Sequence, residues 1–327
     1  GLLPYQSLMG IKAAVSLLVN VMQLNAAIMI VGDFDADGAT STAVAIRALR
    51  LLGHHNVSYL VPNRFEFGYG LTPEIVDVAQ QSKPDLIITV DNGIASIEGV
   101  ARAKQYGIKV LVTDHHLPAD ELPDADAIVN PNQHGDKFEC KATAGVGVIF
   151  YIMLALRAAL RDMQWFTDSR PEPNLAELLD LVALGTVADV VALEHNNRIL
   201  VAQGIARIRS GKVSAGLKAL IKVAGRNIQS LKASDMGFAI APRINAAGRL
   251  EDMSIGIECL LCDDDAKALA LATELDALNH SRREIESEMK QQAFQILDKY
   301  LKNETRSVED VPAALCLFQD DWHEGVI

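Results

Sequence analysis

Several residue types and patterns are scarce in this chain of 327 residues. Aromatic residues make up only 5% of it, there are four cysteines, and no apolar run reaches the length of about 20 residues that a membrane-spanning helix needs. The first residues do not resemble a signal peptide. Half of the residues are apolar, which is enough for one large core or two domains. These features argue against a membrane protein and predict a globular protein of the cytoplasm.

The cysteines are too few and too unevenly spaced for a disulfide framework, and they fit a reducing compartment. Cys259 and Cys262 form a CxxC pair inside an apolar stretch, but there is no second pair to complete a four-ligand zinc site. We therefore predict that this pair consists of core thiols, and we assign no function to any cysteine.

Positive charge is also in short supply, since 30 basic residues stand against 42 acidic ones and the formal net charge is −12. This balance argues against a general nucleic-acid binder. The charge is unevenly distributed, however, because residues 198–234 contain eight basic residues and no acidic one. A solvated helix face is the simpler interpretation of this basic window, and a surface that attracts a polyanion is the other.

Three aspartates follow the apolar run of residues 26–31, which is short and β-branched enough to predict a strand. Asp33, Asp35 and Asp37 lie within five residues, and a small-residue segment that predicts a helix comes next. Carboxylates packed so closely repel one another unless a cation or a proton neutralises them. Hard oxygen ligands on a tight turn therefore predict a divalent metal site.

Two simpler explanations of the aspartates are less satisfactory. The segment begins like a calcium-binding EF-hand loop, but its twelfth position is Val44 where a glutamate is required, and a strand precedes it instead of a helix. Aspartates beside a glycine are also common in turns and helix caps. That explanation accounts for one of the three residues but not for all of them.

Apolar runs recur along the first part of the chain and alternate with helical patterns. Strands are predicted at 26–31, 57–61, 85–90, 108–113 and 127–130. This alternation predicts an α/β fold with a parallel sheet of about five strands that is flanked by helices on both faces. The carboxyl ends of parallel strands share one edge, so residues that follow the strands are expected to converge on one crevice. These residues are Asp33, Asp35, Asp37, Arg64, Asp91, Asp114, His115 and His116.

Beyond Lys141 the pattern is mostly helical. The segment 143–160 predicts a buried helix, and a second helix from 174 is expected to end at Gly185. Asp189 follows in an apolar stretch, where it must either cap a helix or join the metal centre. The segment 242–250 places Arg243 and Arg249 around small residues, which predicts either a phosphate-gripping loop or a surface loop with ordinary salt bridges.

The last part of the chain predicts one long charged helix over residues 263–303, of the kind that often connects two domains. A new strand is expected from about residue 311. Because the sequence begins with Gly1 instead of Met and stops soon after this strand, we expect it to be a fragment of a longer protein.

Four motifs together resemble the DHH phosphoesterase superfamily. They are DFDADG at 33–38, VDNG at 90–93, TDHH at 113–116 and GTVAD at 185–189, in the order expected of that superfamily. The stretches VPNRFEFGYGL, TAGVGV, RINAAGRL and DWHEGVI are similar to the RecJ family of bacterial single-stranded-DNA exonucleases in particular. The resemblance implies a DHH domain over 1–262, with a sheet part to about 140 and a helical part after it. It also implies that 263–303 connects this domain to a truncated DHHA1-like domain, whose first strand lies in 311–327.

The resemblance implies 5′-to-3′ hydrolysis of single-stranded DNA to mononucleotides in recombination and repair, with two Mn²⁺ or Mg²⁺ ions. Carried over by position, the metal ligands would be Asp33, Asp35, Asp37, Asp91, His115 and Asp189. Asp91 would bridge both ions. The residue types fit, because carboxylates and one imidazole suit these ions better than a thiolate metal. We expect His115 and His116 not to bind the same ion, because neighbouring side chains on an extended strand point to opposite sides.

His116 is instead expected to contact a phosphate or assist the leaving group, so that the predicted catalytic residues are Asp91, His115 and His116. Candidate nucleic-acid contacts are Arg64, Arg243, Asn245 and Arg249. The expected partners are single-stranded DNA and, through the resemblance, a single-stranded-DNA-binding protein and a helicase. Two alternatives stay open: a small-substrate DHH phosphodiesterase or manganese-dependent pyrophosphatase, and a non-catalytic DHH-like replication scaffold.

Overall fold

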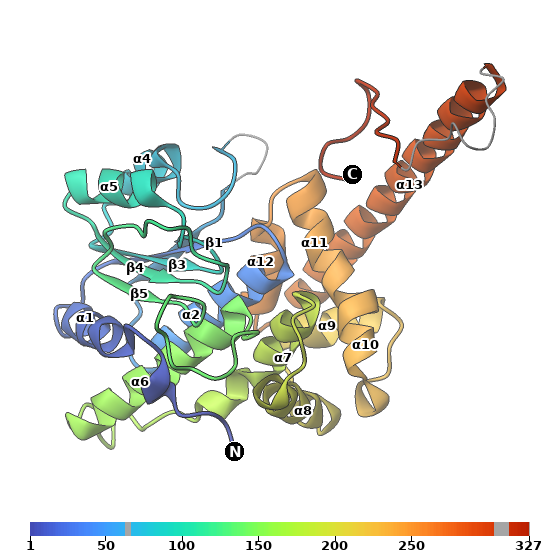
Figure 1. The fold of residues 1–327 in the computed structure, drawn as a ribbon. Coiled ribbons are helices and arrows are strands. Elements are labelled where there is room, and N and C mark those ends of the chain that lie inside the picture. The colour runs from blue at the N-terminus through green and yellow to red at the C-terminus, as the bar shows by residue number, and fades with distance from the viewer. Residues whose placement is uncertain (63–66, 304–313, 327) are drawn as a thin grey trace.

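The computed structural model describes residues 1–62, 67–303 and 314–326, which form a sheet part followed by a helical part (Figure 1). The sheet has five parallel strands in the order β2-β1-β3-β4-β5. They are β1 (Ile28–Gly32), β2 (Val57–Leu60), β3 (Leu86–Val90), β4 (Lys109–Thr113) and β5 (Ala127–Val129). All five predicted strands and the predicted parallel sheet are therefore confirmed.

The register of the sheet brings three strand ends to the same level. Gly32 of β1 pairs with Val90 of β3, and Val90 pairs in turn with Thr113 of β4. The next residue of each strand is an aspartate, namely Asp33, Asp91 and Asp114. The sheet itself therefore places these acidic residues side by side at its carboxyl edge.

Helices cover both faces of the sheet, because strand residues alternate between them. Ile28 and Ile30 of β1 belong to the core shared with α1 (Ile11–Gln23), α2 (Ala36–Leu51) and α6 (Gly145–Asp162), whereas Met29 and Val31 belong to the core under α4 (Pro73–Gln80) and α5 (Ile97–Gln105). Figure 1 shows the two layers above and below the sheet. Both faces are thus buried, which explains why the strand sequences are almost wholly apolar.

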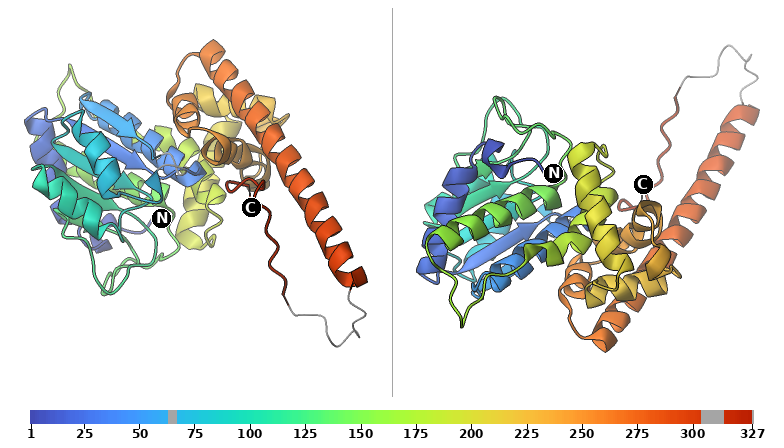
Figure 2. Two further views of the ribbon diagram at one scale, coloured as in Figure 1. Left: turned by 90° about the horizontal axis from the view of Figure 1, so that it is seen from above. Right: turned by 90° about the horizontal axis from the view of Figure 1, so that it is seen from below.

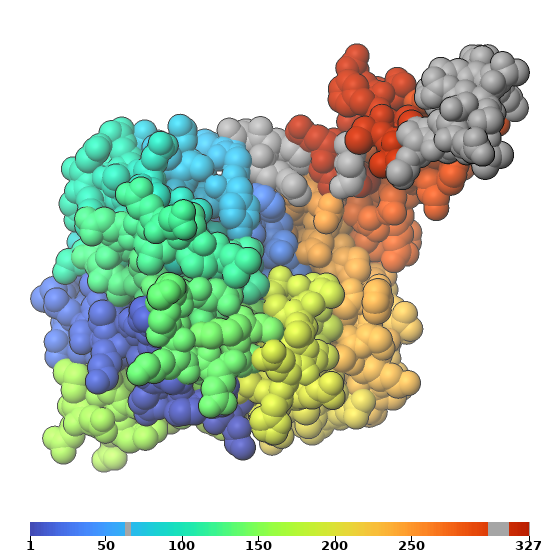
Figure 3. Space-filling model, in the orientation of Figure 1, coloured from blue at the N-terminus to red at the C-terminus, as the bar shows by residue number. Residues whose placement is uncertain are grey.

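The helical part packs against α2. It consists of α7 (Leu179–Ala188), α8 (His195–Arg209), α9 (Ala215–Val223), α10 (Ala233–Asp235), a π-helical turn at Met236–Ile240, α11 (Ala241–Leu250) and α12 (Ser254–Leu261). Buried residues of α2, α6, α7 and α12 share one continuous core. In the space-filling view the helical part lies directly against the sheet part (Figure 3). Helix α2 therefore lies between the sheet and the helical part, and its first turn is buried.

Helix α13 (Asp265–Asn303) confirms the long helix that the sequence predicts. Its first turns are buried at Ala268, Ala272 and Leu275, and its remaining length projects from the body (Figure 2). Residues 314–326 run back beside it, where the Trp322 indole N–H donates a 2.6 Å hydrogen bond to Gln292 Oε1.

Three local predictions need correction. The helix expected to end at Gly185 continues to Ala188, because the missing Cβ at Gly185 lets the helix approach Asp37 closely and the packing outweighs the low helix propensity of glycine. The loop expected at 242–250 is helix α11. Residues 311–313 lie outside the described part, and 314–318 form no strand, since no described strand lies beside them to supply hydrogen bonds. The domain boundaries remain predictions.

Among the residues that the structure describes, no helix is both long and apolar enough to cross a membrane.

Candidate metal centre

The three clustered aspartates occupy the turn between β1 and α2. Asp33 directly follows β1, and its Oδ1 accepts a 2.7 Å hydrogen bond from the Phe34 backbone N–H. Asp35 is the N-cap of α2 and accepts from the Gly38 backbone N–H at 2.9 Å. The helix-cap explanation thus holds for Asp35, as the sequence suggests for one of the three, and it leaves Asp33 and Asp37 to be explained.

Asp37 lies in the first turn of α2 and is fully buried. Its two carboxylate oxygens accept hydrogen bonds from the backbone N–H groups of Gly145 and Val146, at 2.7 and 3.0 Å. These groups begin α6, whose N-terminal dipole favours a negative charge. The start of α6 therefore fixes the Asp37 side chain in one orientation.

Asp91 follows β3 in a left-handed conformation, with φ +63°, that aspartate tolerates better than most residues. Its backbone N–H donates to Thr113 O at 3.1 Å, which holds the turn to β4. The start of α6 approaches so closely that a Cβ at Gly145 would lie 2.6 Å from Asp91 Oδ1. Glycine at 145 is thus required for Asp91 and α6 to share this space.

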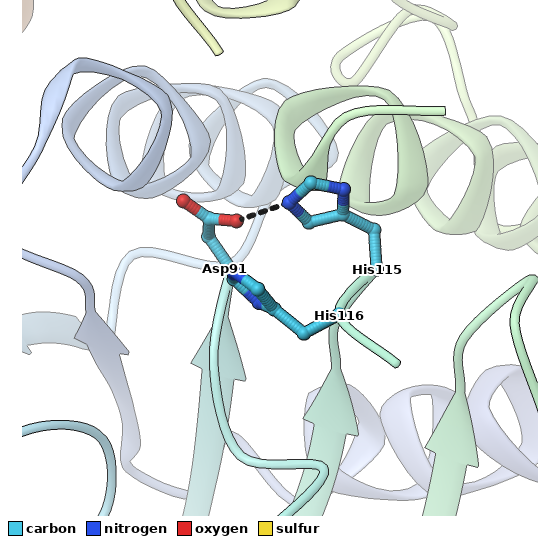
Figure 4. Close-up of side chains that lie close together, drawn as sticks. All are labelled: Asp91, His115 and His116. Carbon is cyan, nitrogen blue, oxygen red and sulfur yellow. Dashed lines mark ion pairs between the residues drawn. The ribbon is translucent and has the colours of Figure 1, made fainter. Parts of the chain in front are cut away.

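His115 brings the separate acidic residues together. Its Nε2 lies 3.0 Å from Asp91 Oδ1, 3.5 Å from Asp189 Oδ2 and 4.0 Å from Asp37 Oδ2. Figure 4 shows Asp91 and His115 directed toward each other from the ends of neighbouring strands. Asp189 reaches the same point as the C-cap residue of α7. The structure therefore brings Asp37, Asp91 and His115 together as predicted. Asp189, for which the sequence left a helix cap or the metal centre open, follows the end of α7 and also lies in this cluster.

Three atoms of this cluster are buried without a hydrogen-bond partner among the described residues. They are Asp91 Oδ1, His115 Nε2 and Asp189 Oδ2. Although the first two are 3.0 Å apart, they do not have the directional geometry of a hydrogen bond. Buried polar atoms are rarely left unsatisfied, because the loss of solvation costs about 1–3 kcal/mol each. Orphaned lone pairs that face one another are the arrangement that a metal ion satisfies, so these residues fit a divalent cation.

Burial also raises the pKa values of the clustered carboxyl groups. Burial, reinforced by the neighbouring Asp35 charge, raises the pKa of Asp33 and of Asp37 to about 7, and burial together with the Asp37 charge raises that of Asp189 to about 7. Burial and the Asp37 charge also raise the pKa of Asp91 well above its usual range. Burial lowers the pKa of His115, which favours the neutral imidazole that can bind a metal.

Potential ligand atoms fall into three overlapping groups, within each of which they lie no more than 4.8 Å apart. The groups are Asp37, His115 and Asp189; Asp33, Asp35 and Asp91; and Asp91, His115 and His116. Asp91 belongs to two of them. The arrangement is therefore compatible with more than one ion, with Asp91 between them.

His116 is held differently from His115. Its Nδ1 lies 2.7 Å from Asp114 Oδ1, and this hydrogen bond is the main cause that raises the pKa of His116. The expectation that the two imidazoles point to opposite sides is wrong, because their ring centroids are only 4.6 Å apart. Strand β4 ends at Thr113, so the alternation of an extended strand does not apply to residues 115 and 116.

Two supporting residues were not assigned a role from the sequence. Burial alone would raise the pKa of Asp114, but hydrogen bonds from His116 and from backbone N–H groups outweigh it and lower that pKa. Asp114 thus anchors both histidines, a role that its position directly before them in TDHH could have suggested. The buried Asn92 donates to Val31 O at 3.1 Å and to Val90 O at 2.9 Å, which ties the Asp91 turn to β1.

The predicted nucleic-acid contacts have mixed outcomes. Arg64 lies outside the described residues. Arg243 is buried in α11 and forms a 2.8 Å ion pair with Asp276, which accounts for it structurally, and its contact with phosphate remains a prediction. Asn245 Oδ1 accepts from the Ala36 N–H at 2.7 Å and supports the start of α2. Arg249 donates to Gly325 O at 3.1 Å and is partly exposed, so it remains a candidate.

Known proteins are similar to this chain in sequence and in structure. Residues 27–186 match the DHH family, N-terminal domain. The chain is 57% identical to the single-stranded-DNA-specific exonuclease RecJ of Salmonella typhimurium, over all of this chain and 56% of that protein. It thus spans about half the length of the curated relatives that it matches.

Solved structures agree with this similarity. A crystal structure of exonuclease RecJ bound to manganese matches with a TM-score of 0.82 and 36% identity, over all of this chain and 76% of the other. A structure of RecJ in complex with Mg²⁺ from Thermus thermophilus matches with a TM-score of 0.69 and 32% identity, over all of this chain and 41% of the other.

Proposed function

We propose a function for this chain, which belongs to the RecJ branch of the DHH family. It is the catalytic core of a metal-dependent exonuclease that degrades single-stranded DNA. The observation that carries the proposal is the group of orphaned atoms on Asp91, His115 and Asp189, which face one another beside the buried Asp37. These buried atoms are left unsatisfied by the protein itself, whereas they suit a cation that activates a phosphodiester.

The residues that would hold two Mn²⁺ or Mg²⁺ ions are Asp33, Asp35, Asp37, Asp91, His115 and Asp189. When bound, such ions supply a reactive water at neutral pH and neutralise the charge that develops on the phosphoryl oxygens. Asp91 is the proposed bridging ligand, since it belongs to two of the three ligand groups. One RecJ structure to which the chain is similar is bound to manganese, and another is in complex with Mg²⁺.

His116 and Tyr69 extend the site toward the substrate. With Nδ1 of His116 held by Asp114, the exposed imidazole also lies beside the Tyr69 hydroxyl, which is 3.4 Å from both ring nitrogens. Burial is the main cause that raises the pKa of Tyr69, so its hydroxyl keeps its proton. His116 is therefore placed to contact a phosphate oxygen or to protonate the leaving group, while the Asp114 carboxylate keeps its ring in position.

The substrate class follows from the relatives. RecJ proteins are named as single-stranded-DNA-specific exonucleases, and we extend this activity to the protein that contains this chain. The proposal includes 5′-to-3′ polarity, release of mononucleotides, a role in recombination and repair in the cytoplasm, and cooperation with a single-stranded-DNA-binding protein and a helicase. Arg249 is the proposed phosphate contact among the described residues.

A direct test incubates the protein with Mn²⁺ and one of three substrates: a single-stranded oligomer labelled at either end, a dinucleotide, or pyrophosphate. Shortening of the oligomer from its 5′ end, with mononucleotides as products, supports the proposal. Efficient turnover of only the small substrates would support the small-substrate alternative instead. No turnover of any substrate, with metal demonstrably bound, would favour the scaffold. The Asp91→Asn variant, prepared in parallel, controls for contaminating nucleases.

A further inference from the structure

A cavity lies at the ends of α2 and α7 that are far from the metal centre. It has a volume of about 680 Å³, within the range of small-molecule binding sites. Its walls come from the C-terminal end of α2, the N-terminal end of α7, the C-terminal end of α8 and the turn before α9. None of the chemistry proposed for the metal centre uses this cavity.

Basic side chains line this cavity without matching acidic partners. Arg50, Arg207 and Lys212 all face it, and none forms an ion pair with any residue that the structure describes. The Nε atom of Arg207 is buried and has no hydrogen-bond partner within the described ranges. A buried guanidinium nitrogen without an acceptor is costly, so a small shift of the Arg207 side chain toward an acceptor oxygen of a ligand would be favourable.

The acidic residues of the cavity are largely compensated. Asp263 pairs with Arg47 at 2.8 Å. The buried Asp180 accepts hydrogen bonds from the backbone N–H groups of Leu181 and Ser214, each at 2.8 Å. Glu177 and Asp180 have no ion-pair partner among the described residues, compared with three unpaired basic residues. Uncompensated charge in the cavity is therefore mainly positive, which favours an anion.

The cavity is separate from the metal centre. Helix α7 has Asp180 at the cavity and Asp189 at the metal centre, and nine residues of helix correspond to about 13 Å. Helix α2 similarly runs from Asp37 to Arg50, which corresponds to about 20 Å. A ligand in the cavity would thus not touch the metal ligands, and the two sites can be tested independently.

We propose that this cavity binds the phosphate group of a mononucleotide-sized ligand, with Arg207, Lys212 and Arg50 as the phosphate contacts. An adjoining cavity of about 710 Å³ shares Arg50 and His55 with it and provides room for the remainder of such a ligand. The small number of unpaired basic side chains and the Glu177 carboxylate favour a single phosphate over a continuous strand, whose many phosphates need many basic contacts. The basic window of residues 198–234 therefore contributes Arg207 and Lys212 to a discrete site.

The test measures binding by isothermal titration calorimetry with the purified protein in EDTA, which keeps the metal centre from binding phosphates through an ion. The probes are deoxyadenosine monophosphate, inorganic phosphate, deoxyadenosine and a single-stranded octamer. We expect the monophosphate to bind and deoxyadenosine not to bind. The Arg207→Gln and Lys212→Gln variants should each weaken binding by about tenfold or more. Lys222→Gln, on the same basic segment but outside the cavity, should bind like the wild type.

The outcomes separate the possible ligands. Inorganic phosphate that binds as tightly as the monophosphate, with the same dependence on Arg207, supports the anion site and identifies free phosphate as its ligand. Binding of the octamer alone, equal binding by all variants, or no binding of either phosphate overturns the proposal. Arg50→Gln, at an exposed position, replaces Arg207→Gln if that variant does not fold by circular dichroism. Oligomer hydrolysis with Mn²⁺ is measured separately, so failure of this site and failure of the proposed nuclease activity are distinguishable.

Discussion

The Asp37 carboxylate accepts a 2.7 Å hydrogen bond from the backbone N–H of Gly145, which joins the first turn of α2 to the first turn of α6. The two residues are 108 positions apart in the sequence. This bond orients one oxygen-rich side chain of the metal centre, and it also brings the α6 backbone against Asp91. The rigidity of the centre therefore depends on α6 as much as on the residues that would bind metal.

Replacement of Asp91 by asparagine should reduce oligomer hydrolysis by about 10³-fold or more, because the change removes the charge of the proposed bridging ligand. Asparagine is the informative choice, since it tolerates the left-handed backbone that Asp91 adopts. Initial rates with Mn²⁺ measure the effect, and circular dichroism checks the fold. The exposed Asp120→Asn serves as the matched control. Wild-type rates in the Asp91 variant would refute the assignment.

Replacement of Gly145 by alanine should weaken metal binding without removing any ligand. The new methyl group would lie 2.6 Å from Asp91 Oδ1, so Asp91 or the start of α6 must move. A shift of about 1 Å in a site of this kind can lower the rate by about 10²-fold. A Mn²⁺ titration of activity should show a higher metal requirement.

Gly237→Ala is the control for this change, because its methyl group would meet Val187 at an ordinary 3.4 Å. Equal metal requirements in the two alanine variants would show that Gly145 does not position Asp91.

The metal-free protein should lose stability as the pH rises from about 4 to about 8. The pKa of Asp33, Asp37 and Asp189 is raised from 3.8 to about 7 by burial and neighbouring carboxylates, so the folded state holds protons that the unfolded state has released in this window. Proton binding by the folded state stabilises it at low pH, and this stabilisation is lost as the pH rises through 7. Melting temperatures in EDTA across this range measure the effect.

Mn²⁺ should reverse this trend, because the cation replaces the protons that the carboxyl groups release. We expect its stabilising effect to be small at pH 5 and larger at pH 8. Asp189→Asn should show a shallower dependence on pH in EDTA than the wild type. An identical pH dependence in the variant would contradict the raised pKa of Asp189.

The Arg243–Asp276 ion pair should be structural instead of DNA-binding. Arg243→Met should lower the free energy of unfolding by about 2–3 kcal/mol, because it leaves Asp276 partly buried without its partner. The double variant Arg243→Met/Asp276→Leu should recover part of this loss, which a urea-unfolding cycle measures. If the single change leaves stability intact and weakens oligomer binding, the result would support the prediction that Arg243 contacts phosphate.

Arg249→Gln should weaken binding of a single-stranded oligomer and reduce the slope of its salt dependence by about 0.7, the value expected for one phosphate contact on a single strand. Fluorescence anisotropy at several salt concentrations, with Ca²⁺ in place of Mn²⁺ to prevent hydrolysis, measures the slope. Lys12→Gln, on the exposed face of α1, is the control. An unchanged slope would limit Arg249 to its contact with Gly325.

Much of the fold was predictable because it depends on local patterns. The five apolar runs became the five strands. The parallel sheet then implied that residues after the strands meet at one edge. The sequence alone therefore predicts that Asp33, Asp91 and His115 lie close together.

Interactions between distant segments were not predictable in the same way. The helix through Gly185 continues because α2 packs against it, and the RINAAGRL segment is helical because α11 packs against α13. Neither cause is visible in a local window of sequence. The partner of Arg243, which is Asp276 on α13, likewise depends on how α11 and α13 pack.

By itself the sequence determined which residues could bind metal and that a parallel sheet would bring most of them together, because strand patterning and residue chemistry are local properties. Only the tertiary structure decided that Asp189 joins them, that His115 and His116 lie side by side, and that Arg243 pairs with Asp276. These outcomes depend on helix packing between residues far apart in the chain, and packing is fixed by the shape of the whole core.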